Sequence, residues 1–536
     1  MRIRRLISSL GETPFSVLTL ILLSVFLVTR LPYFWFNPRV DLSLDSGGYL
    51  ALATSFGEGK WPQLLMRTPG YPLFILLVTT CVDRWLAIIF VQNLLSFLSA
   101  LFLVYSVYRL RRPLALPAAL AMCGFLGSSQ VMIYDISILS ESLYTSTMIL
   151  LIGCLFLGMT LDRAVFFVLA SALMGWAVLD RPAASYFAVI YAVVLAYLLW
   201  NRRRLGTILG FVAPFPVLIL SLCAYNYATA GKFVITAFAE ANLAGATLLF
   251  WEPDPRLPAQ MNAALEKLPE TYSKLGITPQ ELELERNSWD SAALFDLYAK
   301  AYNRLVWSSG FGTGRRFGSG DYIQNRNFVR DASMVAIKRH PILYAKYVWV
   351  NMVMFFGGIG YKYDIQSSLE YRATGPIPSE VRASDLTKDE VRPVAPPAAA
   401  PGRGVEITDE SALEVFMRKR RLAWQGFHGI VFENVAWSWA YLAVTVLSLA
   451  QLVRSRGRHL GAFLMVVVTL IPLGASLVVC MFEVALDRYS YPTQFVYYLS
   501  VALVPLLWLG GGRGQNAAGH APDRPPASPR RDEGIA

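Results

Sequence analysis

Apolar runs of about 20 residues recur along the whole chain and are separated by short polar links. A helix needs about 20 predominantly apolar residues to cross the hydrocarbon core of a bilayer. The pattern therefore predicts a helical protein that crosses a membrane many times. The expected spans are residues 15–28, 85–108, 114–133, 143–161, 164–179, 183–200, 205–225, 429–453, 460–482 and 491–509.

One further run, residues 344–361, is apolar but short and rich in glycine. Without it the bundle has ten transmembrane helices; with it the bundle has eleven, and every later segment changes sides. Lys and Arg gather in the cytoplasmic loops of membrane proteins. On that rule the basic cluster at Arg454 favours ten helices, whereas the basic run 418–421 favours eleven.

The composition agrees with a membrane protein. Of the 536 residues, 55% are hydrophobic and 16% are charged, whereas soluble proteins carry roughly 25% charged residues. The net charge of +11 comes from Lys and Arg in short loops, which is typical of membrane topology rather than of nucleic-acid binding. The five cysteines are scattered and lack zinc-ligand spacing, so we expect no zinc site and no disulfide framework. The predicted fold class is an all-α polytopic integral membrane protein.

Polar segments divide this bundle into parts. The large first outer loop covers residues 33–72, and a Pro/Ala-rich piece at 393–401 is typical of a flexible linker. The expected division is 1–231 for an N-terminal transmembrane module, 232–340 for an outer soluble domain, 341–428 for a re-entrant or spanning helix plus linker, 429–510 for C-terminal transmembrane helices and 511–536 for a disordered tail.

Charged side chains from separate segments fall on one membrane face if the bundle has ten helices. They are Asp41, Asp45 and Arg67 in the first outer loop, Asp135 and Glu141 at the outer ends of the third and fourth spans, Arg181 after the fifth span, and Glu483, Asp487 and Arg488 in the last outer loop. A charge beside a bilayer is costly to hold unless it is solvated, paired or used. Their joint placement indicates a functional site at this face.

Each of these residues also has a purely structural interpretation. Asp45 can cap a short helix that begins in the loop. Arg67 and Arg181 can anchor helix ends at the lipid headgroups. Glu141 can act as a helix cap or pair with Arg181, and the membrane side of Arg488 depends on the number of spans.

Several short motifs follow one another along most of the chain. The most specific pair is D-S-G-G-Y-L-A-L-A at 45–53 with R-T-P-G-Y-P-L-F at 67–74, and weaker ones are L-S-E-S-L-Y-T at 139–145, L-D-R-P-A at 179–183, N-Y-A-T-A-G-K-F at 226–233, R-H-P-I-L-Y at 339–344 and D-R-Y-S-Y-P at 487–492. In this order they resemble the dolichyl-phosphate-mannose protein mannosyltransferase-like superfamily, which has the GT-C fold. That group includes family 39-like glycosyltransferases similar to the lipid A aminoarabinose transferase.

The resemblance implies a transferase that takes a sugar from a polyprenyl-phosphate donor and inverts the anomeric carbon. Asp45 stands at the family's catalytic aspartate, where a carboxylate takes the proton of the attacking acceptor. Glu141 would orient the acceptor or an arginine. Arg67, Arg181 and Arg488 would bind the donor phosphate through charge-assisted contacts.

The secondary candidates are Asp41, Tyr71 and Asp135. The family often has Glu after the catalytic aspartate, whereas this chain has Ser46, so a metal role for that pair stays open. No metal ligands and no certain cofactor are predicted, although a divalent metal remains possible.

The implied partners are a polyprenyl-phosphate-linked sugar donor, a lipid, glycan or protein acceptor, and membrane lipids, with no nucleic acid. The implied location is the inner, or plasma, membrane with the site facing outward. One alternative is a polymerase or ligase of lipid-linked glycans that uses a diphosphate-linked donor. A second is a transporter, which would show charges deep inside spans and internal repeats; the sequence pattern shows neither.

Overall fold

The computed structural model describes residues 13–36, 39–82, 84–302, 322–357, 369–372, 436–482 and 487–508. Within these segments the chain is helical except for loops and one two-stranded ribbon. The predicted all-α polytopic fold is therefore confirmed. The expected linker piece 393–401, the tail 511–536 and Glu483 lie outside the described residues.

Seven described helical segments are long and apolar enough to cross a membrane, or eight if one bent pair counts as a single span. They are α2 (Phe15–Phe36), α5 (Trp85–Leu110), α8 (Ser140–Leu161), η2 (Pro182–Tyr186) with α10 (Phe187–Trp200), α11 (Leu205–Val212) with α12 (Pro214–Ala230), α22 (Ala436–Arg454) and α23 (Leu460–Phe482). Helices of this length and composition indicate an integral membrane protein.

The remaining expected spans, and the run 344–361 whose crossing was left open, are shorter or broken. Helices α6 (Ala115–Leu126) and α7 (Ser129–Ile136) meet at a bend of 61° where one straight span was expected. Helices α9 (Ala164–Asp180) and α19 (Pro341–Gly357) have 17 residues each, and α24 (Asp487–Ala502) has 16. A helix of that length reaches about 26 Å, which is less than the hydrocarbon thickness of about 30 Å. The described residues therefore hold fewer full-length spans than the ten or eleven expected.

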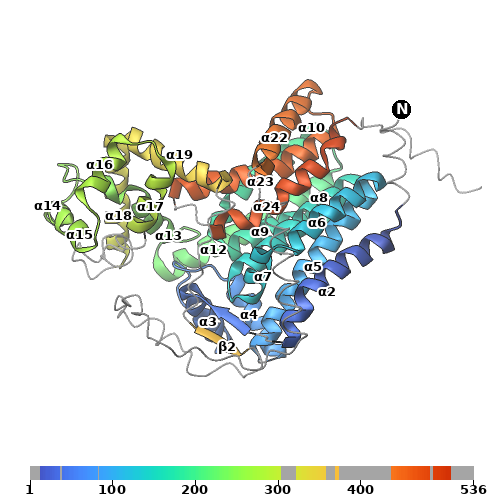
Figure 1. Ribbon diagram of the computed structural model, residues 1–536, viewed down its shortest axis with the longest axis horizontal. Helices are drawn as coiled ribbons and strands as arrows, with labels where there is room; N and C mark the ends of the chain where they lie inside the picture. The colour runs from blue at the N-terminus through green and yellow to red at the C-terminus, as the bar shows by residue number, and fades with distance from the viewer. Residues whose placement is uncertain are drawn as a thin grey trace, which may run out of the picture.

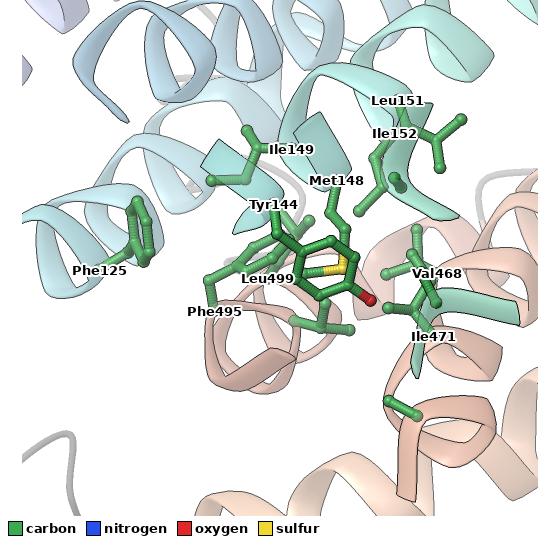
Figure 2. Close-up of a cluster of buried hydrophobic side chains, with 14 of the residues drawn as sticks. Phe125, Tyr144, Met148, Ile149, Leu151, Ile152, Val468, Ile471, Phe495 and Leu499 are labelled. Atoms are coloured by element: carbon green, nitrogen blue, oxygen red, sulfur yellow. The ribbon is translucent and has the colours of Figure 1, made fainter. Parts of the chain in front are cut away.

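Helix α8 lies at the centre of the bundle, packed against α5, α9 and α24 (Figure 1). Lipid tails are as apolar as leucine, so close packing rather than removal from water holds such helices together. A methyl group on Gly153 of α8 would lie 2.7 Å from the ring of Phe102 on α5, so glycine is needed for this approach. Figure 2 shows Met148 of α8 surrounded by side chains that include Ile471 of α23 and Leu499 of α24.

The segment after α12 forms a lobe of short helices beside the bundle (Figure 1). Its elements are α13 (Phe238–Thr247), η3 (Leu248–Phe250), α14 (Ala259–Leu265), α15 (Leu268–Lys274), α16 (Pro279–Asn287), α17 (Ser291–Ala301) and α18 (Tyr322–Arg339). The lobe has an apolar core of its own, in which Leu248, Met261 and Leu268 are almost fully buried. Burying each such side chain stabilises a water-exposed domain by about 1.5–3 kcal/mol. The boundaries 232–340 for an outer domain stay a prediction.

The first polar loop contains one strand and two helices. Strand β1 (Arg39–Leu42) pairs antiparallel with β2 (Leu369–Arg372), which the sequence pattern did not predict. Helix α3 (Leu44–Gly57) follows β1, and α4 (Gly70–Cys81) leads toward α5. The alternative interpretation of Asp45 as a helix cap is wrong, because Ser43 occupies the cap position and Asp45 lies in the first turn of α3.

Candidate functional site

Helix α3 is fixed at its start by two serines. The backbone N–H of Ser43 donates to the Ser46 hydroxyl at 2.9 Å, and that hydroxyl donates to the carbonyl of Ile138 at 2.8 Å. Ser46 is completely buried. This contact joins the start of α3 to the connection between α7 and α8, and so fixes Asp45 one residue away. A carboxylate in the first turn is also favoured by the positive end of the helix dipole.

Asp45 and Arg67 form an ion pair at the accessible side of the loop. Arg67 Nη2 lies 2.5 Å from Asp45 Oδ1, and the two side chains are 25% and 28% exposed. The Arg67 guanidinium lies over the ring of Tyr49, with Cζ 4.8 Å from the ring centre. A methyl group on Gly48 would stand 3.1 Å from Arg67 Nε, so glycine leaves room for the guanidinium against α3.

Glu141 and Arg181 form a second ion pair, which is more deeply buried. Arg181 Nη1 lies 2.8 Å from Glu141 Oε1, and the side chains are 11% and 3% exposed. Glu141 stands in the first turn of α8, whereas Arg181 directly follows α9. The structure therefore places Glu141 beside Arg181, which was one of the interpretations left open by the sequence.

Tyr49 connects the two ion pairs. Its hydroxyl lies 3.2 Å from the Ser140 hydroxyl, next to Glu141, while its ring lies beneath Arg67. Burial raises the pKa of the Tyr49 hydroxyl, and the charges of both ion pairs also act on it. Tyr49 lies within the D-S-G-G-Y-L-A-L-A motif but was not among the predicted site residues, and its hydroxyl was the available signal for a polar role.

Tyr71, a secondary candidate, is fully buried and turned toward the bundle. Its hydroxyl donates to Gln92 Oε1 at 2.6 Å, and its ring meets that of Tyr49 edge to face at 5.0 Å. The preceding Gly70 packs so closely on α9 that an added methyl would stand 2.7 Å from the backbone nitrogen of Asp180. The R-T-P-G-Y-P motif therefore joins the polar loop to the bundle.

Asp180 is a buried carboxylate that the sequence analysis did not single out. It is 1% exposed, and neither carboxylate oxygen has a hydrogen-bond partner among the described residues. Its position directly before Arg181 was the available signal. It brings a second acidic group close to the Glu141–Arg181 pair.

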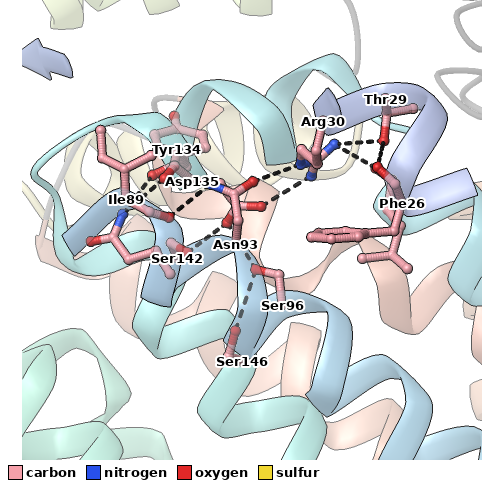
Figure 3. A network of polar contacts seen from close by, with 12 residues as sticks. Phe26, Thr29, Arg30, Ile89, Asn93, Ser96, Tyr134, Asp135, Ser142 and Ser146 are labelled. Carbon is pink, nitrogen blue, oxygen red and sulfur yellow. Dashed lines mark hydrogen bonds and ion pairs between the residues drawn. The ribbon is translucent and has the colours of Figure 1, made fainter. Parts of the chain in front are cut away.

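The other predicted residues lie elsewhere or are described only in part. Asp135 is fully buried in an ion pair with Arg30 (Figure 3) and takes no part in the Asp45–Arg67 pair. Asp41 stands in β1 opposite Glu370, and Arg488 stands in the first turn of α24; the side chains of Asp41 and Arg488 lie outside the description. The structure thus brings together Asp45, Arg67, Glu141 and Arg181.

A small cavity of about 10 Å³ adjoins the Glu141–Arg181 pair. It is lined by Arg181, Tyr144 and Tyr186 together with Thr493 of α24 and Val479 of α23. The Tyr144 and Tyr186 hydroxyls are hydrogen-bonded at 2.7 Å. The N-terminal and C-terminal halves of the bundle therefore meet at Arg181. Within the described residues no cluster of three or more His, Cys, Asp or Glu side chains is placed to hold a metal ion.

The arrangement combines groups that suit acid–base and phosphate chemistry. A carboxylate can accept a proton from a hydroxyl or amine, and a guanidinium can bind two oxygens of a phosphate. Asp45 and Arg67 are the members of the set that solvent reaches. The buried pair behind them has its charges neutralised inside the protein.

Comparison with protein-family models and with curated proteins finds no match. Comparison with solved structures finds a similarity to the crystal structure of the Archaeoglobus fulgidus oligosaccharyltransferase in the apo form, with a TM-score of 0.38 and 10% sequence identity. The match covers 92% of this chain and 50% of that one, so this chain spans about half the length of the archaeal protein. A similarity at this score carries no argument about activity.

Proposed function

We propose that this protein is a GT-C-type membrane glycosyltransferase that moves a sugar from a polyprenyl-phosphate donor to an acceptor hydroxyl or amine. The single observation that carries the proposal is the partly exposed Asp45–Arg67 pair at the start of α3. It sits in the first polar loop of a bundle of apolar helices. In this proposal the site faces outward from the inner membrane, and the lobe 232–340 lies on the same side.

The reaction assigns one role to each member of the pair. Asp45 takes the proton from the acceptor as the acceptor oxygen or nitrogen bonds to the anomeric carbon. The bond from that carbon to the phosphate oxygen breaks, and its electron pair leaves with the lipid phosphate. Arg67 stabilises the charge of the departing phosphate by a bidentate contact.

Inversion sets a geometric demand on this pair. The base must act on the face of the sugar opposite the leaving group, so a sugar ring has to lie between Asp45 and the phosphate. The two side chains contact each other at 2.5 Å in this structure. The proposal therefore requires the pair to open when the donor binds.

Glu141 and Arg181 take a supporting role in the proposal. Both are nearly buried and bound to each other, and separating a buried ion pair leaves an uncompensated charge that is strongly destabilising. We assign donor phosphate binding first to Arg67, with Arg181 as the neighbouring cation at the small cavity.

The test compares the wild type with Asp45→Asn in membranes at matched expression. A panel of radiolabelled polyprenyl-phosphate sugars is supplied with crude lysate as the acceptor source, and loss of label from the lipid is followed. We expect turnover by the wild type and a rate at least about 10²-fold lower in the variant, the usual contribution of a general base.

Asp162→Asn is a matched control. Asp162 also pairs with an arginine, Arg203, but in a loop outside the site, and its left-handed backbone (φ 52°) suits asparagine. It should leave turnover unchanged. Full turnover by Asp45→Asn would contradict the role of Asp45, and turnover with diphosphate-linked donors alone would favour a ligase or polymerase instead.

A further inference from the structure

Arg30 and Asp135 form an ion pair deep inside the bundle (Figure 3). Arg30 Nη2 lies 3.0 Å from Asp135 Oδ2, and the side chains are 2% and 0% exposed. The other oxygen of Asp135 accepts hydrogen bonds from the Ser96 hydroxyl at 2.8 Å and the Ser142 hydroxyl at 2.6 Å. Both oxygens of this carboxylate therefore accept hydrogen bonds within the protein.

The guanidinium of Arg30 also binds the end of α6, at the break between α6 and α7. Arg30 Nη1 donates to the carbonyl of Leu126, the last residue of α6, at 3.0 Å, and Nε donates to Asn93 Oδ1 at 2.8 Å. Carbonyls at a helix end lack partners within the helix. The guanidinium from α2 therefore satisfies the end of α6 and holds α7, which carries Asp135, at its bend.

The same network reaches the connection between α7 and α8, residues 137–139. Gln92 Nε2 donates to the carbonyls of Asp135 and Ser137 at 3.1 and 3.0 Å, and Gln92 Oε1 accepts from the Tyr71 hydroxyl at 2.6 Å. Ser142, which binds Asp135, directly follows Glu141. The network therefore fixes both ends of this connection.

The other side of the connection faces the candidate site. The carbonyl of Ile138 accepts the hydrogen bond of Ser46, which neighbours Asp45. Asp135 and Gln92 bind the network to one side of this connection. On the other side, the carbonyl of Ile138 binds Ser46 at the start of α3. A displacement of the connection would move Asp45 and Glu141 together.

We propose that Arg30 and Asp135 are positioning residues that set the α7–α8 connection and, through it, the placement of Asp45 and Glu141. The inference rests on the proposed function for its kinetic consequences, although the positioning itself is a structural property. A buried ion pair is seldom more stabilising than apolar side chains of similar volume. Its use here is therefore better explained by the geometry that it imposes than by stability.

The test uses Arg30→Met and Asp135→Leu, singly and together. Each single change leaves a buried charge, so both should lower the unfolding temperature; the double change removes both charges and should restore it. In the double variant we expect kcat to fall about 10- to 100-fold, since misplacing reactive groups by about 1 Å can have that effect. The donor KM should change less than kcat, because Arg67 remains.

A second readout does not depend on catalysis. Hydrogen–deuterium exchange at the first turns of α3, residues 44–50, should be faster in the double variant than in the wild type. Tyr441→Phe serves as the control, because it removes another buried hydrogen bond, to the carbonyl of Thr469 at 2.5 Å, far from this network in sequence. It should leave both α3 exchange and kcat unchanged.

Ser142→Ala keeps the test decisive if the double variant fails to fold. It removes only the hydrogen bond to Asp135 and should still speed exchange at α3 and lower kcat. Wild-type exchange and wild-type kcat in a folded variant would overturn the inference. If even the wild type transfers no sugar, the proposed function fails while the exchange experiment still decides the positioning role.

Discussion

Replacing Gly48 by alanine separates the stability of α3 from the placement of Arg67. Glycine inside a helix is destabilising by about 0.5–1 kcal/mol relative to alanine, so the substitution should favour the helix itself. The new methyl would however stand 3.1 Å from Arg67 Nε and 3.7 Å from Cζ. We therefore expect a displaced guanidinium in a helix of equal or greater stability.

The kinetic effect follows from the hydrogen bond that the displaced Arg67 guanidinium would make to the donor phosphate. A hydrogen bond to a charged group contributes about 1.5–3 kcal/mol, and losing about half of it corresponds to a roughly 3- to 12-fold rise in the donor KM. The assay measures label release at several donor concentrations, together with thermal unfolding in the same detergent.

Gly206→Ala in α11 is the matched control, because a methyl there meets no atom within 4 Å. It should keep the wild-type donor KM and lose no stability. A Gly48→Ala protein with the wild-type KM would refute the reasoning that α3 sets the position of Arg67 for the phosphate.

Three further outcomes are expected. Arg67→Lys should fold normally but raise the donor KM about 10-fold, measured by label release, because an ammonium cannot make the bidentate contact. Gly70→Ala should lower the free energy of unfolding by about 1–3 kcal/mol in a thermal or denaturant assay, since its methyl would lie 2.7 Å from the Asp180 backbone. Burial raises the pKa of Glu285 above 4.5, so the folded chain binds this proton more tightly than the unfolded chain, and stability falls as pH rises from about 4.5 through the raised pKa. Glu285→Gln should therefore raise the unfolding temperature at pH 7 relative to the wild type, with a smaller difference near pH 4. The control Glu283→Gln, at an exposed position, should not raise it. An equal shift of the unfolding temperature at both pH values would contradict a raised pKa of Glu285.

The sequence pattern predicted most of the long helices because apolar runs of that length have few other uses. It did not predict the break between α6 and α7, since only four residues, Gly127 to Gln130, interrupt an otherwise apolar run. At this break Arg30 reaches across from α2 and donates a hydrogen bond to the carbonyl of Leu126. Such a long-range contact leaves no periodic signal in the chain.

The candidate site was predictable where its members are close in sequence. Asp45 and Arg67 share one loop, and both stood out as charges beside an apolar run. Asp135 also stood out as a charge, but only the structure shows that Arg30 neutralises it inside the bundle. The pairing of β1 with β2 joins segments more than 300 residues apart, and short strands in a helical chain carry little pattern.

The contact between Asp45 and Arg67 has a consequence for the order of events in the proposed reaction. The donor phosphate competes with Asp45 for the same guanidinium, so the carboxylate gains its freedom only after the lipid has bound. Donor and acceptor would then bind in a compulsory sequence. Because Asp45 stays paired with Arg67 until that moment, the resting protein would also hold no free carboxylate for acceptors that arrive alone.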